Sequence, residues 1–121
     1  MQKKRTVPVC YLRTHRRAWG LTQKELVGLL GLKSVEHLSR VERGERKPTM
    51  GIALACEVLF GIAPGRMFPR LYQFVEERVV RNVYERHETI REATSKASAR
   101  KRTLLAQALE RAITSSHSPG V

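Results

Sequence analysis

GLTQKELVGLLGLKSVEHLSRVERG, residues 20–44, contains two short segments with apolar side chains at helical spacing, joined at Gly31. The first segment begins with Thr22, and Glu25 follows three residues later. This is the Ser/Thr-x-x-Glu capping box that starts a helix. The second segment begins near Ser34, another good N-cap residue. Two short helices joined by a glycine-containing turn form a helix-turn-helix, so this stretch predicts that motif.

The rest of the chain also has helical periodicity and no strand-like alternation. One helix is expected from about 9 to 19, another from 48 to 61, and a longer one from 69 to 91 with its apolar residues on one face. The polar stretch 93–102 is interpreted as a hinge, and a last amphipathic segment follows at 104–113. The short helices are not stable alone in water, so they must pack on each other. The sequence therefore predicts an all-α protein.

The charge balance indicates a polyanionic partner. The chain of 121 residues has 23 Lys and Arg against 11 acidic residues, a formal net charge of +12, and every acidic residue is Glu. Residues 1–70 hold 14 of the basic side chains and only 5 of the acidic ones. Such an excess on a small protein favours nucleic acid over an anionic membrane as the partner. The helix-turn-helix stretch lies in this basic part, and a helix fits the major groove of B-DNA.

Several other classes of protein are disfavoured. The chain is short and has no Asp, no nucleophile-plus-base pattern and no phosphate loop, so we expect no enzymatic activity. Cys10 and Cys56 form no CxxC pair, and no Cys or His spacing matches a metal site, so no metal or cofactor is expected. Cys56 falls on an apolar stripe, which favours core packing over a redox role. No small-molecule ligand domain is evident.

The expected location is the cytoplasm, with association to the nucleoid when the protein is bound to DNA. No apolar run approaches the ~20 residues needed to span a bilayer, and no targeting segment is visible. Unpaired cysteines are typical of a reduced cytoplasmic protein. We therefore expect no membrane partner.

The sequence resembles the phage-repressor-like, Cro/C1-type (XRE) helix-turn-helix domains. The matching segments, in the family's order, are LRTHRRAWGLTQKELVGLLG, LSRVERGERKPT and LACEVLFGI, and they cover about residues 9–68. The resemblance implies a five-helix, lambda-repressor-like domain in which the helix starting near Ser34 reads the major groove. It also implies that Gln23 binds a phosphate and that Arg16 pairs with Glu42 to lock the first helix onto the third.

One feature departs from the family pattern. The turn between Gly31 and Leu38 has one residue more than usual, which leaves the start of the third helix open by one residue. With the third helix in the major groove, an Arg side chain can form two hydrogen bonds with a guanine, and a Glu side chain can accept one from a cytosine amino group. The candidates for base contact are Val35, Glu36, His37 and Arg40. The candidates for phosphate contact, which set register and affinity, are Thr22, Gln23, Lys33, Ser34, Arg43, Arg46 and Lys47.

Alternatives remain open for some of these residues. Glu36 and Arg40 either contact bases or form a solvated salt bridge on an exposed helix. His37 touches a base, a phosphate or neither. Arg16 and Glu42 are either the structural pair of the family or an ordinary surface pair worth under ~1 kcal/mol.

The chain divides into four predicted regions. Residues 1–8 form a flexible basic arm, which enters a DNA groove or only adds charge, and residues 9–68 form the helix-turn-helix DNA-binding domain. Residues 69–114 form a C-terminal helical dimerisation region, and residues 115–121 form a disordered tail. The expected fold class is an all-α, five-helix lambda-repressor-like domain followed by one or two C-terminal helices for dimerisation.

The long C-terminal helix has a larger apolar stripe than a five-helix domain needs to complete its core. Such a stripe must be buried on the last helix of the same chain or on a second copy. A homodimer is favoured because a two-fold protein reads two half-sites about 34 Å apart, which predicts a palindromic operator. The residues assigned to dimerisation are Leu71, Tyr72, Val75, Val79 and Val83.

Together these features predict a sequence-specific, double-stranded-DNA-binding transcriptional regulator. We interpret it as a homodimeric repressor that occludes a promoter. One alternative is an antitoxin-like autoregulator whose C-terminal helices bind a protein partner. Another is a non-specific nucleic-acid binder, which would show only a small preference for selected over random DNA.

Overall fold

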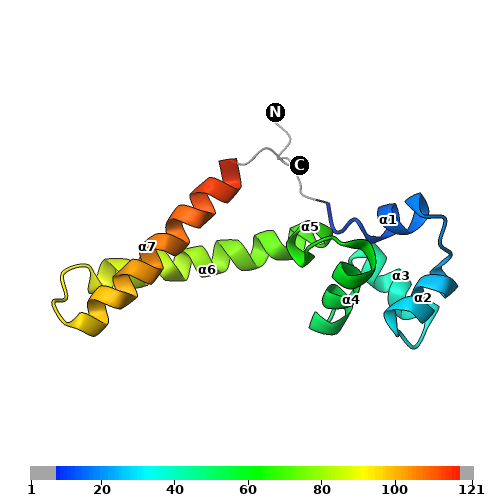
Figure 1. The fold of residues 1–121 in the computed structure, drawn as a ribbon, viewed down its shortest axis with the longest axis horizontal. Coiled ribbons are helices and arrows are strands. Elements are labelled where there is room, and N and C mark those ends of the chain that lie inside the picture. Colours follow the sequence, from blue (N-terminus) through cyan, green and yellow to red (C-terminus); the bar gives the residue numbers. More distant parts are fainter. Residues whose placement is uncertain (1–7, 118–121) are drawn as a thin grey trace. The chain divides into compact units, whose positions relative to one another are not determined.

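The computed structural model describes residues 8–117, with side chains described as far as Thr114. Every regular element in this range is a helix (Figure 1), which confirms the predicted all-α class. The chain forms two compact units, of which the first ends at Gln73 and the second begins at Phe74. The predicted basic arm, apart from Pro8, and the last four residues of the predicted tail lie outside the described residues.

The first unit contains five helices and the beginning of a sixth. In chain order they are α1 (Leu12–Ala18), α2 (Gln23–Leu30), α3 (Val35–Arg43), α4 (Met50–Phe60), α5 (Pro64–Met67) and the first turn of α6 (Pro69–Ile90).

Side-chain caps determine where the central helices begin. The hydroxyl of Thr22 accepts the amide of Glu25, and the Glu25 carboxylate accepts the amide of Thr22, both at 3.0 Å. These bonds complete the predicted capping box, and the bond from the Thr22 amide is the main cause that lowers the pKa of the Glu25 carboxyl. Ser34 accepts the amide of His37 at 3.1 Å, and Thr49 caps α4 in the same way. Each cap satisfies an amide that the helix start leaves without a partner.

Gly44 ends α3 in a backbone conformation that would be strained for any other residue type. Its φ of +78° lies in the left-handed region. A Cβ at this position would also overlap the side chain of Val9. Glycine avoids both costs, so it lets α3 stop here and lets the N-terminal segment pass close to the helix end.

One apolar core holds the five helices together. Leu12, Leu26 and Leu38 come from α1, α2 and α3 and have no exposed surface. Burying a side chain of this size contributes about 1.5–3 kcal/mol relative to leaving it exposed. The complete set of buried apolar residues is Leu12, Leu26, Leu38, Val41, Ile52, Ala53, Cys56, Met67 and Phe68.

The second unit consists of the rest of α6 and of α7 (Lys96–His117). The guanidinium of Arg102 donates to the carbonyl of Ile90 at 3.0 Å and also to the carbonyl of Ala93, which fastens α7 to the turn that precedes it. No side chain between residues 74 and 114 is buried. Several apolar side chains, such as Val80, Val83 and Leu105, are half-buried, but a helical hairpin without a fully buried side chain has no closed core of its own. Its exposed large apolar side chains are Phe74, Val75, Val79, Tyr84, Leu104 and Ile113.

Two expectations about the C-terminal part need correction. The polar stretch 93–102 is not a hinge beyond its first three residues, because α7 already begins at Lys96. The hydroxyl of Ser95 accepts the amide of Ser98 at 3.1 Å and so provides an N-cap, and Ala, Lys and Arg favour a helix even without an apolar stripe. The helix also continues to His117, three residues into the predicted tail. None of the helices in the described range is long and apolar enough to cross a membrane.

Candidate nucleic-acid interface

Helix α3 is fixed to the domain along one side and exposed along the other. Leu38, Val41 and Glu42 face inward and are buried. Ser34 is the N-cap and Val35 is the first helical residue, so the extra residue of the turn lies before the helix. The structure thereby removes the one-residue ambiguity in the start of this helix.

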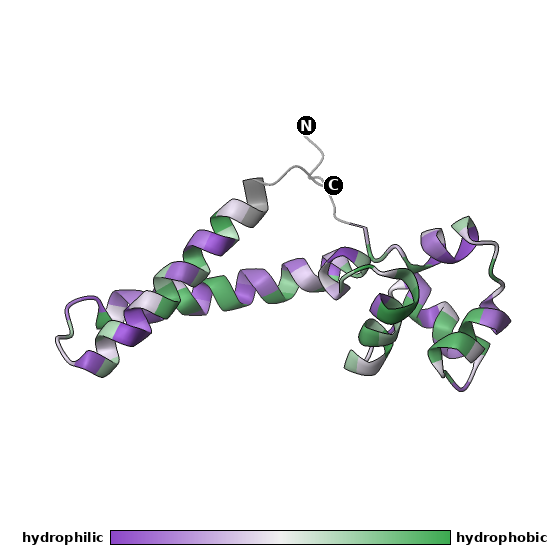
Figure 2. Ribbon diagram, in the orientation of Figure 1, coloured by the Kyte–Doolittle hydropathy of each residue, from purple (hydrophilic) through white to green (hydrophobic). Residues whose placement is uncertain are grey.

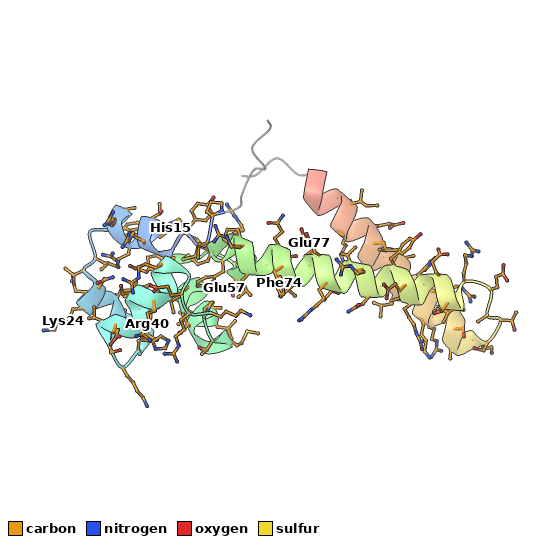
Figure 3. The ribbon with its side chains drawn as sticks, turned by 180° about the vertical axis from the view of Figure 1, so that it is seen from behind. His15, Lys24, Arg40, Glu57, Phe74 and Glu77 are labelled. Atoms are coloured by element: carbon orange, nitrogen blue, oxygen red, sulfur yellow. The ribbon has the colours of Figure 1, made fainter. Side chains whose placement is uncertain are left out.

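Three of the base-contact candidates lie on the exposed side of α3. Val35 is exposed in the first turn. Arg40 forms an ion pair with Glu36 one turn away, at 2.7 Å, and the two side chains are 52% and 72% exposed. An exposed pair of this kind contributes at most about 1 kcal/mol, so little energy opposes its separation when a base arrives. Figure 3 shows Arg40 among the side chains that project from α3.

His37 does not face fully outward as expected. Its ring is half-buried, and its Nε2 atom has no contact with solvent and forms no hydrogen bond with the described residues. Successive residues of a helix are 100° apart, so His37 lies beside the buried row of Leu38 and Val41, at the edge of the inner side of α3. Its ring is therefore less available to a groove than the side chain of Arg40.

A buried carboxylate ties α3 to α1. The Glu42 side chain has no exposed surface and accepts hydrogen bonds from Arg16, at 2.7 Å from Nε and 3.3 Å from a terminal guanidinium nitrogen. Arg16 also donates to the carbonyl of Leu21 at 3.0 Å, and Arg13 approaches the carboxylate at 3.9 Å. A bidentate, charge-assisted pair restricts geometry as well as contributing energy. The pair that the resemblance implies thus holds α3 at a defined angle to α1.

Gln23, in the first turn of α2, contacts the same carboxylate. Its Nε2 atom donates to Glu42 at 3.0 Å. A side-chain amide carries two N–H donors, so one hydrogen is not used in this bond. The phosphate contact that the resemblance implies for Gln23 stays a prediction, and the bond to Glu42 is an additional role that the sequence did not reveal.

The other phosphate candidates lie at the start of α2, around the start of α3 and in the turn that follows α3. Thr22 and Ser34 use their oxygens as caps, and each hydroxyl keeps a hydrogen to donate. Arg43 is paired with Glu45 at 2.5 Å. All of these candidates are exposed: Thr22, Lys33, Ser34, Arg43, Arg46 and Lys47.

The residues assigned to dimerisation divide between the two units. Leu71 packs against the core of the first unit, and the ring of Tyr72 lies close to Gly65 of α5. The first turn of α6 therefore completes the helix-turn-helix domain. The other three residues belong to the second unit and are exposed or half-buried: Val75, Val79 and Val83.

The two cysteines are packing residues. Cys56 is fully buried, and burial raises the pKa of its thiol from 9.0 to about 11. Burial also raises the pKa of Cys10, whose Sγ donates to the carbonyls of Val41 and Glu42 at 3.7 Å. A protonated thiol is a poor nucleophile and a poor metal ligand. In the part of the chain that the structure describes, no three His, Cys or Glu side chains are placed to hold a metal ion.

The arrangement of α2 and α3 is that of a DNA-binding helix-turn-helix. A capped helix is held from behind by a core and a buried ion pair, and its exposed face carries charged side chains that can reach a groove. Residues 9–68 match the family model described as a helix-turn-helix domain, so this part of the chain belongs to that family. The match confirms the helix-turn-helix domain predicted from the sequence and is consistent with the resemblance to XRE-type domains. Comparison with curated proteins and with solved structures gave no match.

Proposed function

We propose that the protein is a sequence-specific transcriptional regulator that binds double-stranded DNA as a homodimer and represses by occluding a promoter. In this proposal α3 enters the major groove, and Val35, Glu36 and Arg40 contact base edges. The exposed phosphate candidates around the starts of α2 and α3 and in the turn after α3 hold the domain on the DNA backbone. Repression by occlusion requires no catalytic group.

The observation that carries the proposal is the way α3 is held. Glu42 fixes the helix through bonds to Arg16 and Gln23, while Glu36 and Arg40 remain exposed on the other side. A rigidly supported helix with an exposed polar face suits direct reading of bases, because the helix backbone is already held in position before binding. The family match supports binding to DNA.

The second unit supports assembly with a second copy. Its two helices bury no side chain between residues 74 and 114, although Val75 and Val79 are apolar and exposed. Packing two such hairpins together would give each the core that it lacks. The same uncovered surface also fits an antitoxin-like alternative, in which an unrelated protein covers the hairpin.

The main test is selection of bound sites from random double-stranded DNA with the purified protein. We expect a palindrome, whose half-sites correspond to the two copies of α3. Arg40→Ala should relax the preference at one position of each half-site, at a cost of about 1–3 kcal/mol for the preferred base. Lys33→Ala, the matched loss of one exposed positive charge in each copy, should weaken all sequences alike and reduce the salt slope by about two, or about one for each half-site.

The outcomes separate the rival functions. If no sequence is enriched, the protein is a non-specific binder and the proposal is wrong. If Arg40→Ala and Lys33→Ala change every sequence equally, the proposed division between base and phosphate contacts is wrong.

The dimer is tested by the molar mass of the protein in solution. Val79→Glu places a charge on the exposed face of α6 and should abolish self-association through this helix and so lower the molar mass, whereas Arg81→Glu, also on α6 but replacing one charged side chain by another, should leave the molar mass unchanged. A monomeric wild-type protein that binds an unrelated protein through the hairpin would favour the antitoxin-like alternative.

A further inference from the structure

Helix α4 is apolar around its whole circumference. Glu57 is its only charged residue, and Figure 2 colours most of the helix as hydrophobic. One side of α4 faces the core of the first unit. On the other side, Met50 is 72% exposed, Leu54 48% and Val58 88%. A helix that is apolar all round is normally covered all round, and nothing within the first unit covers this outer face.

The shape of the outer face is complementary to itself. Met50, Leu54 and Val58 follow each other at four-residue spacing and form a ridge. Gly51 and Ala55 form the next row at the same spacing, and their small size leaves a groove beside the ridge. Ridges and grooves at four-residue spacing interlock when two helices cross at about −50°. In a two-fold pair, the ridge of each copy can therefore enter the groove of the other.

Gly51 is unexplained by the packing of a single chain. A Cβ at this position would meet only the Oγ1 atom of Thr49, at an ordinary 3.7 Å. A glycine inside a helix is less favourable than alanine by roughly 0.5–1 kcal/mol. A second helix packed closely against this face would explain the glycine, because a Cβ at residue 51 would fill the groove that the other helix enters.

The charges also fit a second copy. The first turn of α4 contains no acidic residue, although a negative charge there is favourable because of the helix dipole. A two-fold axis beside Leu54 allows a parallel or an antiparallel pair of helices, and in the antiparallel pair Glu57 of one copy faces Gly51 of the other. Each copy then places its only α4 carboxylate at the positive end of the other helix.

We propose that the outer face of α4 packs against the same face of a second copy, with Leu54 next to the two-fold axis. This interface uses none of the base or phosphate candidates and none of the three valines of α6. It is therefore a second surface for self-association, through which one dimer joins another. The proposal does not depend on DNA binding.

The test is cysteine cross-linking of the full-length protein without DNA. In the Leu54→Cys variant the two new thiols lie beside the axis, whereas in Val58→Cys they lie on opposite sides of it. Within a dimer the effective concentration is on the order of millimolar, so at micromolar protein the Leu54→Cys dimer should form on the order of 100-fold faster by oxidation. Val58→Cys is the matched control, because it is the more exposed position. The wild-type protein gives the background from Cys10 and Cys56.

Two results would overturn the proposal. Equal rates for the two variants would mean random collisions, and no cross-linked dimer with Leu54→Cys would mean that something other than a second copy covers α4. Adding Glu57→Lys to Leu54→Cys should slow cross-linking severalfold, because it brings a positive charge to the positive helix end. An unchanged rate would contradict the antiparallel arrangement. Failure of the DNA-binding proposal would leave all of these rates unaffected.

Discussion

Replacing Glu42 with Gln is expected to destabilise the helix-turn-helix domain by about 3 kcal/mol. Removing one partner of a buried ion pair costs about 3–5 kcal/mol, because the other charge stays buried without compensation. Here Gln keeps the shape and one acceptor, and Arg16 keeps its bond to the carbonyl of Leu21, so the loss should fall at the lower end. A domain of this size loses roughly 4–8 °C of melting temperature for each kcal/mol.

The assay is urea and thermal unfolding, followed by circular dichroism and by the fluorescence of Trp19. Trp19 is the only tryptophan in the chain and lies in the first unit, but it is 74% exposed, so circular dichroism is the main signal and fluorescence a supporting one. Glu36→Gln is the matched control: it lies in the same helix, changes the net charge equally and breaks an exposed ion pair worth at most about 1 kcal/mol. If Glu42→Gln costs no more than Glu36→Gln, the buried pair does not hold α3 and the reasoning is refuted.

Three further predictions concern a cap, a buried thiol and the hairpin turn. Thr49→Ala removes the cap of α4 and should cost about 1 kcal/mol in urea unfolding, and an unchanged midpoint would argue against the cap. Since the pKa of Cys56 is raised from 9.0 to about 11, its contribution to stability is complete below pH 9 and is lost as the pH rises towards 11. Wild type should therefore lose stability more steeply over this range than Cys56→Ala, and parallel curves would contradict the assignment. Arg102→Ala removes both bonds to the turn carbonyls and should speed amide exchange there, whereas Arg100→Ala, from an exposed position, should not; equal effects would disprove the role of the turn contact.

Local signals predicted the helices around the candidate site well. The hydrogen bonds that cap α2 and α3 join residues three positions apart, so Thr22 and Ser34 predict the two helix starts from the local sequence. Gly44 marks the end of α3 for a similar reason, because its left-handed φ is a local requirement, whereas the close approach of Val9 is not visible in the local sequence. The start of α7 was missed because Ser95 was not recognised as a cap and the helix begins without an apolar stripe.

Contacts between distant residues were harder to predict. Gln23 bonds Glu42 from 19 positions away, and neither periodicity nor composition contains this information. The partial burial of His37 was not predicted, because a helical residue beside an inward-facing position can be either exposed or partly covered. The pair of Arg16 and Glu42 was expected only because the sequence resembles a known family. Tertiary packing thus decides the details that local chemistry leaves open.

The absence of a buried side chain in the hairpin of α6 and α7 has a consequence for how the amount of protein controls its activity. If a second copy covers this hairpin, as proposed, the order of the hairpin depends on the concentration of the protein. At low abundance the uncovered hairpin would open often and be cut by proteases, whereas assembled copies would be protected. The amount of intact protein would then rise more steeply than its rate of synthesis. This would sharpen the change from low to high activity of the protein as its synthesis increases.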